Sequence, residues 1–165
     1  MQLDNEKNNS IKFFCKNYLI PKDISYDLSF NHEDESYGVY FSEEGLTFNM
    51  LLRDDDVLVS ARGIAPLFTN EKALRQVKEY ILRCNHDNCL SKFDFFNIID
   101  GKLNIVCGFD KFFCEDNMKF TLIDGMAEIK RMMRTYYPGI IEIASEKISV
   151  KEAILKYLYK GDDYE

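Results

Sequence analysis

Alternating apolar and polar positions dominate residues 24–61 and predict four consecutive β-strands. The alternation runs over 24–30, 37–41, 46–52 and 57–61, and polar turn residues separate these runs. Short strands joined by tight turns form an antiparallel meander with one apolar and one largely polar face. We therefore expect half-buried strands whose apolar face is covered by helices.

A 3.6-residue period replaces the alternation from residue 70 onward. Apolar residues recur at steps of three and four and so share one face of a helix, which Thr69 or Asn70 can cap. These residues are Leu74, Val77, Ile81 and Cys84. The pattern predicts one amphipathic helix that ends near Asn85.

A β-hairpin is predicted after this helix. Asp100-Gly101 lies between two alternating runs, and this dipeptide favours a type I′ turn. In this register two cross-strand pairs form the core face, namely Ile98 with Leu103 and Phe96 with Ile105. The opposite face carries a second apolar set, which we expect to contact a partner protein if no helix covers it. Its members are Phe93, Phe95, Ile99 and Val106.

A short helix is predicted ahead of the strands. Ser10 can cap it, and Pro21 stops it because proline lacks the N–H that the next helical turn requires. Its inner face carries Ile11, Phe14, Cys15 and Tyr18. Residues 1–9 are expected to be a frayed leader.

Two helices are predicted after the hairpin. A continuous apolar stripe indicates a long helix over 118–136, which Pro138-Gly139 is expected to end. Residues 140–144 then look extended. Ser149 and Glu152 have the spacing of a capping box, which opens a C-terminal helix over 149–159.

The predicted order is α-ββββ-α-ββ-α-α, which indicates an α+β fold. An antiparallel meander and a hairpin would be packed on one face by helices. A chain of 165 residues fits one domain over 1–165, with 149–159 as an appended C-terminal helix.

Composition narrows the class of protein. The formal net charge is -7 and the sequence pI is about 5.0, which disfavours a nucleic-acid binder because phosphates require clustered cations. The first residues are acidic and polar and lack the apolar core of a signal peptide, and no apolar run reaches membrane-span length. Five cysteines, an odd number, favour reduced thiols and a cytoplasmic location.

The turn after residue 83 holds the sharpest cluster of reactive side chains. Cys84, His86 and Cys89 could bind zinc, with Cys107 or Cys114 as a fourth ligand. Cys84 and His86 could instead form a thiol nucleophile and its base. However, Cys84 continues the helix stripe and Cys107 continues the hairpin core face, so packing as small apolar residues is the preferred interpretation. We accordingly expect no metal, no cofactor and no catalytic residue.

Three other groups of residues have a simpler structural explanation. The acidic turns Glu43-Glu44 and Asp54–Asp56 could serve catalysis or calcium binding, but such turns are usually solvated. A small cationic patch near a helix end would complement the helix dipole, and consists of Lys130, Arg131 and Arg134. The stripe Met118–Met133 could line a peptide groove, although packing against the sheet is the more economical explanation.

The middle of the chain resembles the YbjN family, whose members have the type III secretion chaperone-like fold. The resemblance lies in a helix ending LRCN at 82–85, an aromatic strand KFDFF at 92–96, the turn Asp100-Gly101 and the strand LNIVCGF at 103–109. It extends over residues 10–137. The predicted meander has one strand more than is usual, and the last helix lies outside the simplest form of the fold. The resemblance implies a small, acidic, cytosolic protein that holds an extended partner chain and has no catalytic residues.

These observations favour a non-enzymatic, cytoplasmic protein-binding module, secretion-chaperone-like or regulatory, with a protein partner and the capacity to form a homodimer. Neither nucleic acid nor a membrane is expected as a partner. One alternative is a small metal-binding or enzymatic domain that uses Cys84, His86 and Cys89. Another is an immunity-type protein that neutralises a basic partner through its acidic turns.

Overall fold

The computed structural model describes residues 2–33, 36–52, 56–65, 70–88, 91–99, 102–112 and 118–159. The main elements follow one another as α1 (Gln2–Phe14), β1 (Tyr26–Asn31), β2 (Ser36–Glu43), β3 (Leu46–Leu52), β4 (Asp56–Ala65), α2 (Glu71–His86), β5 (Ser91–Ile99), β6 (Lys102–Phe112), α3 (Met118–Ala144) and α4 (Val150–Ala153). Short π- and 3₁₀-helical segments extend two of the helices: η1 (Cys15–Leu19) and η2 (Ile20–Lys22) after α1, and η4 (Ile154–Leu158) after α4.

This mixture of helices and antiparallel strands confirms the predicted α+β class. The strand order is β1-β2-β3-β4-β6-β5, and β1 pairs with β2, β2 with β3 and β3 with β4, each pair antiparallel. The chain divides into two compact units, one formed by Met1–Arg62 and Gly108–Ile129 and the other by Gly63–Cys107 and Lys130–Glu165. The expectation of one domain stays a prediction.

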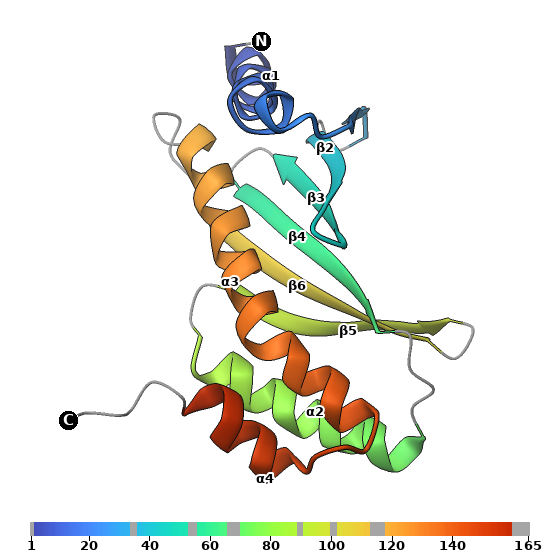
Figure 1. The fold of residues 1–165 in the computed structure, drawn as a ribbon. Helices are drawn as coiled ribbons and strands as arrows, with labels where there is room; N and C mark the ends of the chain where they lie inside the picture. Colours follow the sequence, from blue (N-terminus) through green and yellow to red (C-terminus); the bar gives the residue numbers. More distant parts are fainter. Residues whose placement is uncertain are drawn as a thin grey trace, which may run out of the picture. The chain divides into compact units, whose positions relative to one another are not determined.

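In the first unit, an aromatic core joins α1 to the meander. The helix packs against β2 (Figure 1). The rings of Phe14 and Phe41 lie 5.8 Å apart between centroids. Phe41 stacks in turn on Phe48 of β3 at 5.1 Å, and the three side chains are buried. The alternating pattern thus placed the apolar residues of β2 and β3 on the covered face, as expected.

The start of α1 differs from the prediction. Ser10 is a buried position inside the helix rather than its cap, and residues 2–9, expected as a frayed leader, are helical. Residues 2–9 are polar except for Leu3, but they contain good helix formers such as Glu6 and Lys7, so the helix extends beyond the apolar stripe. The helical chain ends after Pro21, where Asp23 adopts a left-handed conformation (φ 55°).

In the second unit, α2 begins as the sequence predicts. The Asn70 side chain accepts a hydrogen bond from the Ala73 amide at 2.8 Å, which is the geometry of an N-cap. The buried stripe includes Val77, Ile81 and Cys84, and it also takes in Tyr80. The helix packs against β5 and α4, and all three belong to the second unit (Figure 1).

The long helix α3 continues through Pro138-Gly139, so the predicted helix end and the extended segment over 140–144 are wrong. Gly139 lies against α2: a Cβ atom at this position would lie 2.5 Å from the Tyr80 hydroxyl oxygen. The same hydroxyl donates to the Tyr136 carbonyl at 3.4 Å, close to the proline. Packing of α2 on this stretch therefore stabilises a helix that its local sequence disfavours.

The C-terminal part of the described chain follows the prediction more closely. Ser149 and Glu152 form a capping box that opens α4, and the helical path continues as η4 to Leu158. Residues 160–165 lie outside the described residues. Among the helices that are described, none combines the length and apolar character needed to cross a bilayer.

Candidate functional site

The Cys84 end of α2 is a packed helix terminus. The Cys84 side chain is buried, and burial, the largest effect, raises the pKa of its thiol to about 12. A buried thiol with a raised pKa keeps its proton at neutral pH, which is unfavourable for a nucleophile or a metal ligand. Exposed His86 pairs instead with neighbouring Asp87, at 3.1 Å between Nδ1 and Oδ1. Cys89 lies outside the described residues, within which no three potential metal ligands cluster.

The Asn88 side chain gives the polar turn after Cys84 a structural role. Its amide donates to the Cys84 carbonyl at 2.7 Å and its oxygen accepts from Arg131 of α3 at 2.7 Å. The side chain therefore satisfies a carbonyl at the end of α2 and ties this end to the second half of α3. The sequence prediction missed this role, although asparagine just after a helix is a common stop signal.

Phe93, one of the residues assigned to a partner-binding face, is only 3% exposed. Lys92 and Asp94 on either side of it are exposed, so Phe93 points into the core. The Asn85 side chain binds both backbone groups of Phe93, accepting from its N–H and donating to its C=O, each at 2.8 Å. The placement of Phe93 on a free contact face is therefore wrong, because α2 covers this part of β5.

Of the other three residues predicted to form the partner-binding face of the hairpin, Phe95, Ile99 and Val106, only Val106 has a described side chain. Ile105 and Cys107 are buried, in agreement with the predicted core face. Val106 between them is half-buried. The side chains of Phe95 and Ile99 lie outside those described, and so does the turn Asp100-Gly101. A role of Phe95, Ile99 and Val106 in partner contact stays a prediction.

The other candidate groups have partners within their own units or are buried. The Glu43 carboxylate accepts from the Tyr18 hydroxyl at 3.1 Å and from the Lys22 ammonium at 3.0 Å. Lys130 of the cationic patch is buried, at 8% exposure, and Met126 and Met133 are buried, which confirms core packing for that part of the methionine stripe. Residues 54 and 55 lie outside the described residues.

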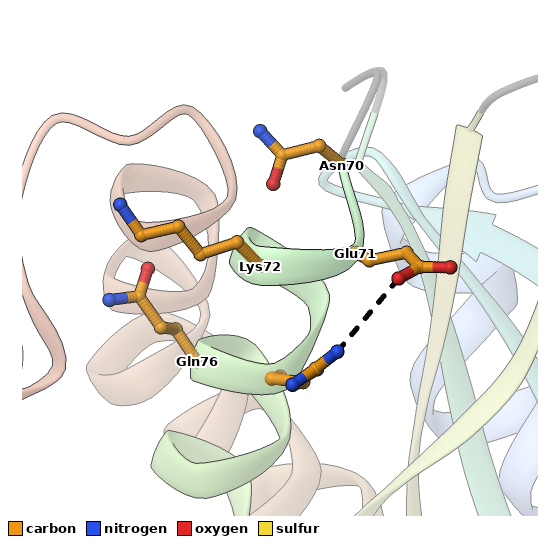
Figure 2. A pocket seen from close by; sticks show the side chains of 5 residues that line it. Asn70, Glu71, Lys72 and Gln76 are labelled. Carbon is orange, nitrogen blue, oxygen red and sulfur yellow. Dashed lines mark ion pairs between the residues drawn. The ribbon is translucent and has the colours of Figure 1, made fainter.

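An open hollow lies at the first turns of α2 (Figure 2). Its lining side chains are Asn70, Glu71, Lys72, Arg75 and Gln76. Asn70 is the N-cap and also binds Glu146, and Glu71 pairs with Arg75 at 3.9 Å within the helix. Three of the lining side chains are therefore engaged in capping α2, in an ion pair within it or in a bond to Glu146, and we assign no site to the hollow.

The exposed apolar face of β1 is the strongest candidate for a functional surface in the described part of the chain. In the antiparallel pairing of β1 with β2, Leu28 lies opposite Val39 and Phe30 lies opposite Tyr37. Paired residues share a face of the sheet, so Leu28 and Phe30 lie on the same face that α1 covers at β2. Yet Leu28 is 55% exposed and Phe30 is 40% exposed, whereas Val39 is 1% exposed. The expectation of a half-buried β1 is therefore wrong at these two residues, because the cover that α1 gives to β2 does not extend to them.

The outer edge of β1 is also open in the described structure. The strand begins the strand order, and none of the described strands pairs with its outer side. Edge strands are commonly protected by lysine, by proline or by a bulge. The sequence of β1, YDLSFN, contains no lysine or proline, and its pairing with β2 is continuous from Tyr26 to Asn31. An apolar face and free backbone groups thus lie along the same strand.

The stretch of sequence that contains this strand is rich in acidic residues. Residues 23–52 contain seven Asp and Glu residues and no Lys or Arg: Asp23, Asp27, Glu33, Asp34, Glu35, Glu43 and Glu44. Asp27 lies on the opposite face of β1 from Leu28 and is exposed, as are Asp23 and Glu33. The alternating pattern predicted this strand but not the exposure of its apolar residues. Two features of the sequence could have indicated an open edge, namely that this is the first strand of the meander and that it contains no lysine.

Comparison with known proteins gives a similarity in fold and no family. No protein-family model matches the chain, and no curated protein matches it. The crystal structure of YbjN from E. coli is similar in fold, with a TM-score of 0.49 and 12% identity over 84% of this chain and 94% of that chain. We infer neither membership nor function from a similarity at this level. Membership in the YbjN family stays a prediction.

Proposed function

We propose that this protein is a non-enzymatic protein-binding module that takes up an extended segment of another polypeptide along β1. The observation that supports this proposal most directly is that Leu28 and Phe30 are exposed although they lie on the core-facing side of an edge strand. Soluble proteins rarely leave contiguous apolar surface uncovered unless it contacts a partner. An added strand would cover these side chains and would also pair with the free backbone groups of β1.

The described reactive groups support a binding role better than a catalytic one. Cys84 is buried with a raised thiol pKa, and exposed His86 pairs with a carboxylate that adjoins it in the chain. Glu43 is held by Tyr18 and Lys22. None of these groups forms a pair of acid and base around a cavity, which catalysis by side chains would require.

Selection of peptides from a random twelve-residue display library, followed by NMR of the labelled protein, tests this function. Selected peptides should shift the backbone amide signals of β1 more than those of α2. Leu28→Ser combined with Phe30→Ser should weaken their binding about tenfold or more, because the apolar contact is lost. Leu82→Ser is the matched control: Leu82 lies on α2 and is 69% exposed.

Two results would contradict the proposal. One is a library that yields no binder. The other is a set of binders that the double variant at Leu28 and Phe30 leaves unaffected, since those peptides would use another surface. Both exposed residues can be changed without opening a cavity, so circular dichroism should show that the variant remains folded.

A further inference from the structure

We propose that the segment bound by β1 is cationic, with Lys or Arg alternating with apolar residues along an extended strand. This inference rests on the proposed function and adds the chemical class of the partner. It follows from the charge at β1, where Asp23, Asp27 and Glu33 are exposed, and from the sequence between residues 23 and 52, which has seven acidic residues and no Lys or Arg. One of the seven, Glu43, is paired with Lys22 just outside this stretch, so the remaining six give the stretch its net acidity.

The charge is placed to act on a neighbouring strand. Asp27 lies within β1, and Asp23 and Glu33 lie just beyond its two ends. All three are exposed, and the described cations form no ion pair with them. In an antiparallel pair, the Cβ atom of the residue directly across from Asp27 would lie within about 5.5 Å of the Asp27 Cβ atom, where opposite charges on the two side chains attract.

The alternation within β1 sets the pattern of its partner. Leu28 and Phe30 project to one face, and Asp27, Ser29 and Asn31 project to the other. Because paired residues share a face, apolar residues of the added strand would extend the apolar face and its cations would lie on the side of Asp27. A segment of alternating apolar and basic residues matches both faces at once.

The same charge disfavours a second copy of this chain as the occupant. Pairing of β1 with β1 would bring together two acidic stretches that each lack Lys and Arg. Like charges that face one another across an interface cost free energy and slow association. Acidic residues therefore replace the usual lysine or proline in protecting this edge from self-pairing, while leaving it open to a basic strand.

Four synthetic eight-residue peptides test the inference by fluorescence anisotropy against the full-length protein. The first alternates Val and Lys, the second Val and Glu, and the third Val and Ser; the fourth is the first with a central proline that prevents strand pairing. The Val–Lys peptide should bind at least about tenfold more tightly than the others. Its affinity should fall about tenfold when sodium chloride is raised from 50 to 500 mM, because salt screens exposed charges.

Matched variants locate the effect. Asp27→Asn should weaken the Val–Lys peptide several-fold, whereas Glu79→Gln, which removes an exposed acid from α2, should not. Leu28→Ser with Phe30→Ser should abolish the binding. Leu82→Ser should leave the binding unchanged.

Each remaining outcome overturns the inference in a recognisable way. Equal binding of the Val–Ser and Val–Lys peptides, lost in the Leu28 and Phe30 variant, would remove the charge selectivity while the proposed function stands. Binding that is insensitive to this variant would place the contact elsewhere and remove both. Sedimentation that shows a dimer of the free protein, made monomeric by the same variant, would identify a second copy as the occupant. Absence of binding by every peptide would also reject the cationic segment, and the library selection would then decide the proposed function alone.

Discussion

The two strands that end the strand order, β1 and β5, are protected very differently. At β5, the Asn85 side chain occupies the backbone N–H and C=O of Phe93, whose own side chain is buried beneath neighbouring structure. At β1, Leu28 and Phe30 are exposed and no described strand pairs with the outer side. A sheet edge that offers free backbone groups invites pairing with another chain. One edge is therefore closed by α2, and the other is left open to a partner.

This difference does not arise from the strand sequences alone. Around Phe30 in β1 and around Phe93 in β5 the sequence alternates apolar with polar residues, and both phenylalanines lie on a core-facing side. What distinguishes them is the helix that packs beside β5. Alternation therefore identifies which face of a strand is apolar, but whether that face is buried depends on helices or strands, distant in the sequence, that pack against it.

The largest expected effect comes from truncating the two phenylalanines. Phe93→Ala should lower the free energy of unfolding by about 3–5 kcal/mol, because it removes a buried ring and leaves a cavity. Phe30→Ala should cost about 1 kcal/mol or less, because much of its ring already contacts water. Urea unfolding followed by circular dichroism measures both values. Equal losses at the two positions would show that β1 is covered in solution.

The cover of β5 depends on how α2 is held, and Gly139 tests that dependence. A Cβ atom there would lie 2.8 Å from the Tyr80 Cζ atom and 2.9 Å from the Tyr157 Cδ2 atom. Both are ring atoms that cannot rotate away singly, so Gly139→Ala should destabilise the protein by about 1–3 kcal/mol. Glycine is a poorer helix former than alanine, so an exposed helical site would show the opposite sign. A stabilised variant would therefore contradict this packing.

Asn85→Ala tests the closure of the β5 edge directly. The change removes two hydrogen bonds of 2.8 Å and leaves the Phe93 N–H and C=O without their partner. We expect a loss of about 1–2 kcal/mol, since unmade hydrogen bonds of part-buried groups are costly. Hydrogen exchange of the Phe93 amide should accelerate more than that of the Val77 amide within α2. Unchanged exchange at Phe93 would mean that water or another group already satisfies it.

The smallest expected effect is an electrostatic one at the attachment of η4. Glu142 accepts from Lys156 at 2.9 Å and from Tyr157 at 3.0 Å, and the Lys156 hydrogen bond, the largest effect, lowers the pKa of the Glu142 carboxyl. A lowered folded-state pKa stabilises the fold above the ordinary carboxyl range, and this contribution is lost as pH falls through the lowered value. Glu142→Gln should therefore reduce the urea midpoint slightly at pH 7. The difference from the unaltered protein should shrink at pH 3.

Much of the local structure followed from the sequence because it depends on neighbouring residues. Asn70 caps α2 and Ser149 with Glu152 opens α4, since a side chain and a backbone amide three residues apart meet whenever a helix begins there. The strands β2 and β3 appeared where alternation predicted them. The α+β class followed from the order of these elements.

The errors arose where distant residues outweigh local preference. Pro138-Gly139 reads as a helix end, but Tyr80 packs on Gly139 and α3 continues. Phe93 was assigned to an exposed face because the sequence does not show that Asn85 would bind its backbone. In the candidate site, alternation identified Leu28 and Phe30 as apolar positions of a strand and wrongly implied that they are buried.

The sequence by itself determined which residues can share a face, where helices begin, and that the stretch from residue 23 to 52 is acidic without a cation. Those properties follow from backbone periodicity and composition. The tertiary structure decided which apolar faces are covered, because cover requires a second element to pack against them. It left Leu28 and Phe30 at the acidic edge of β1 exposed, and this is the surface on which the proposed function rests.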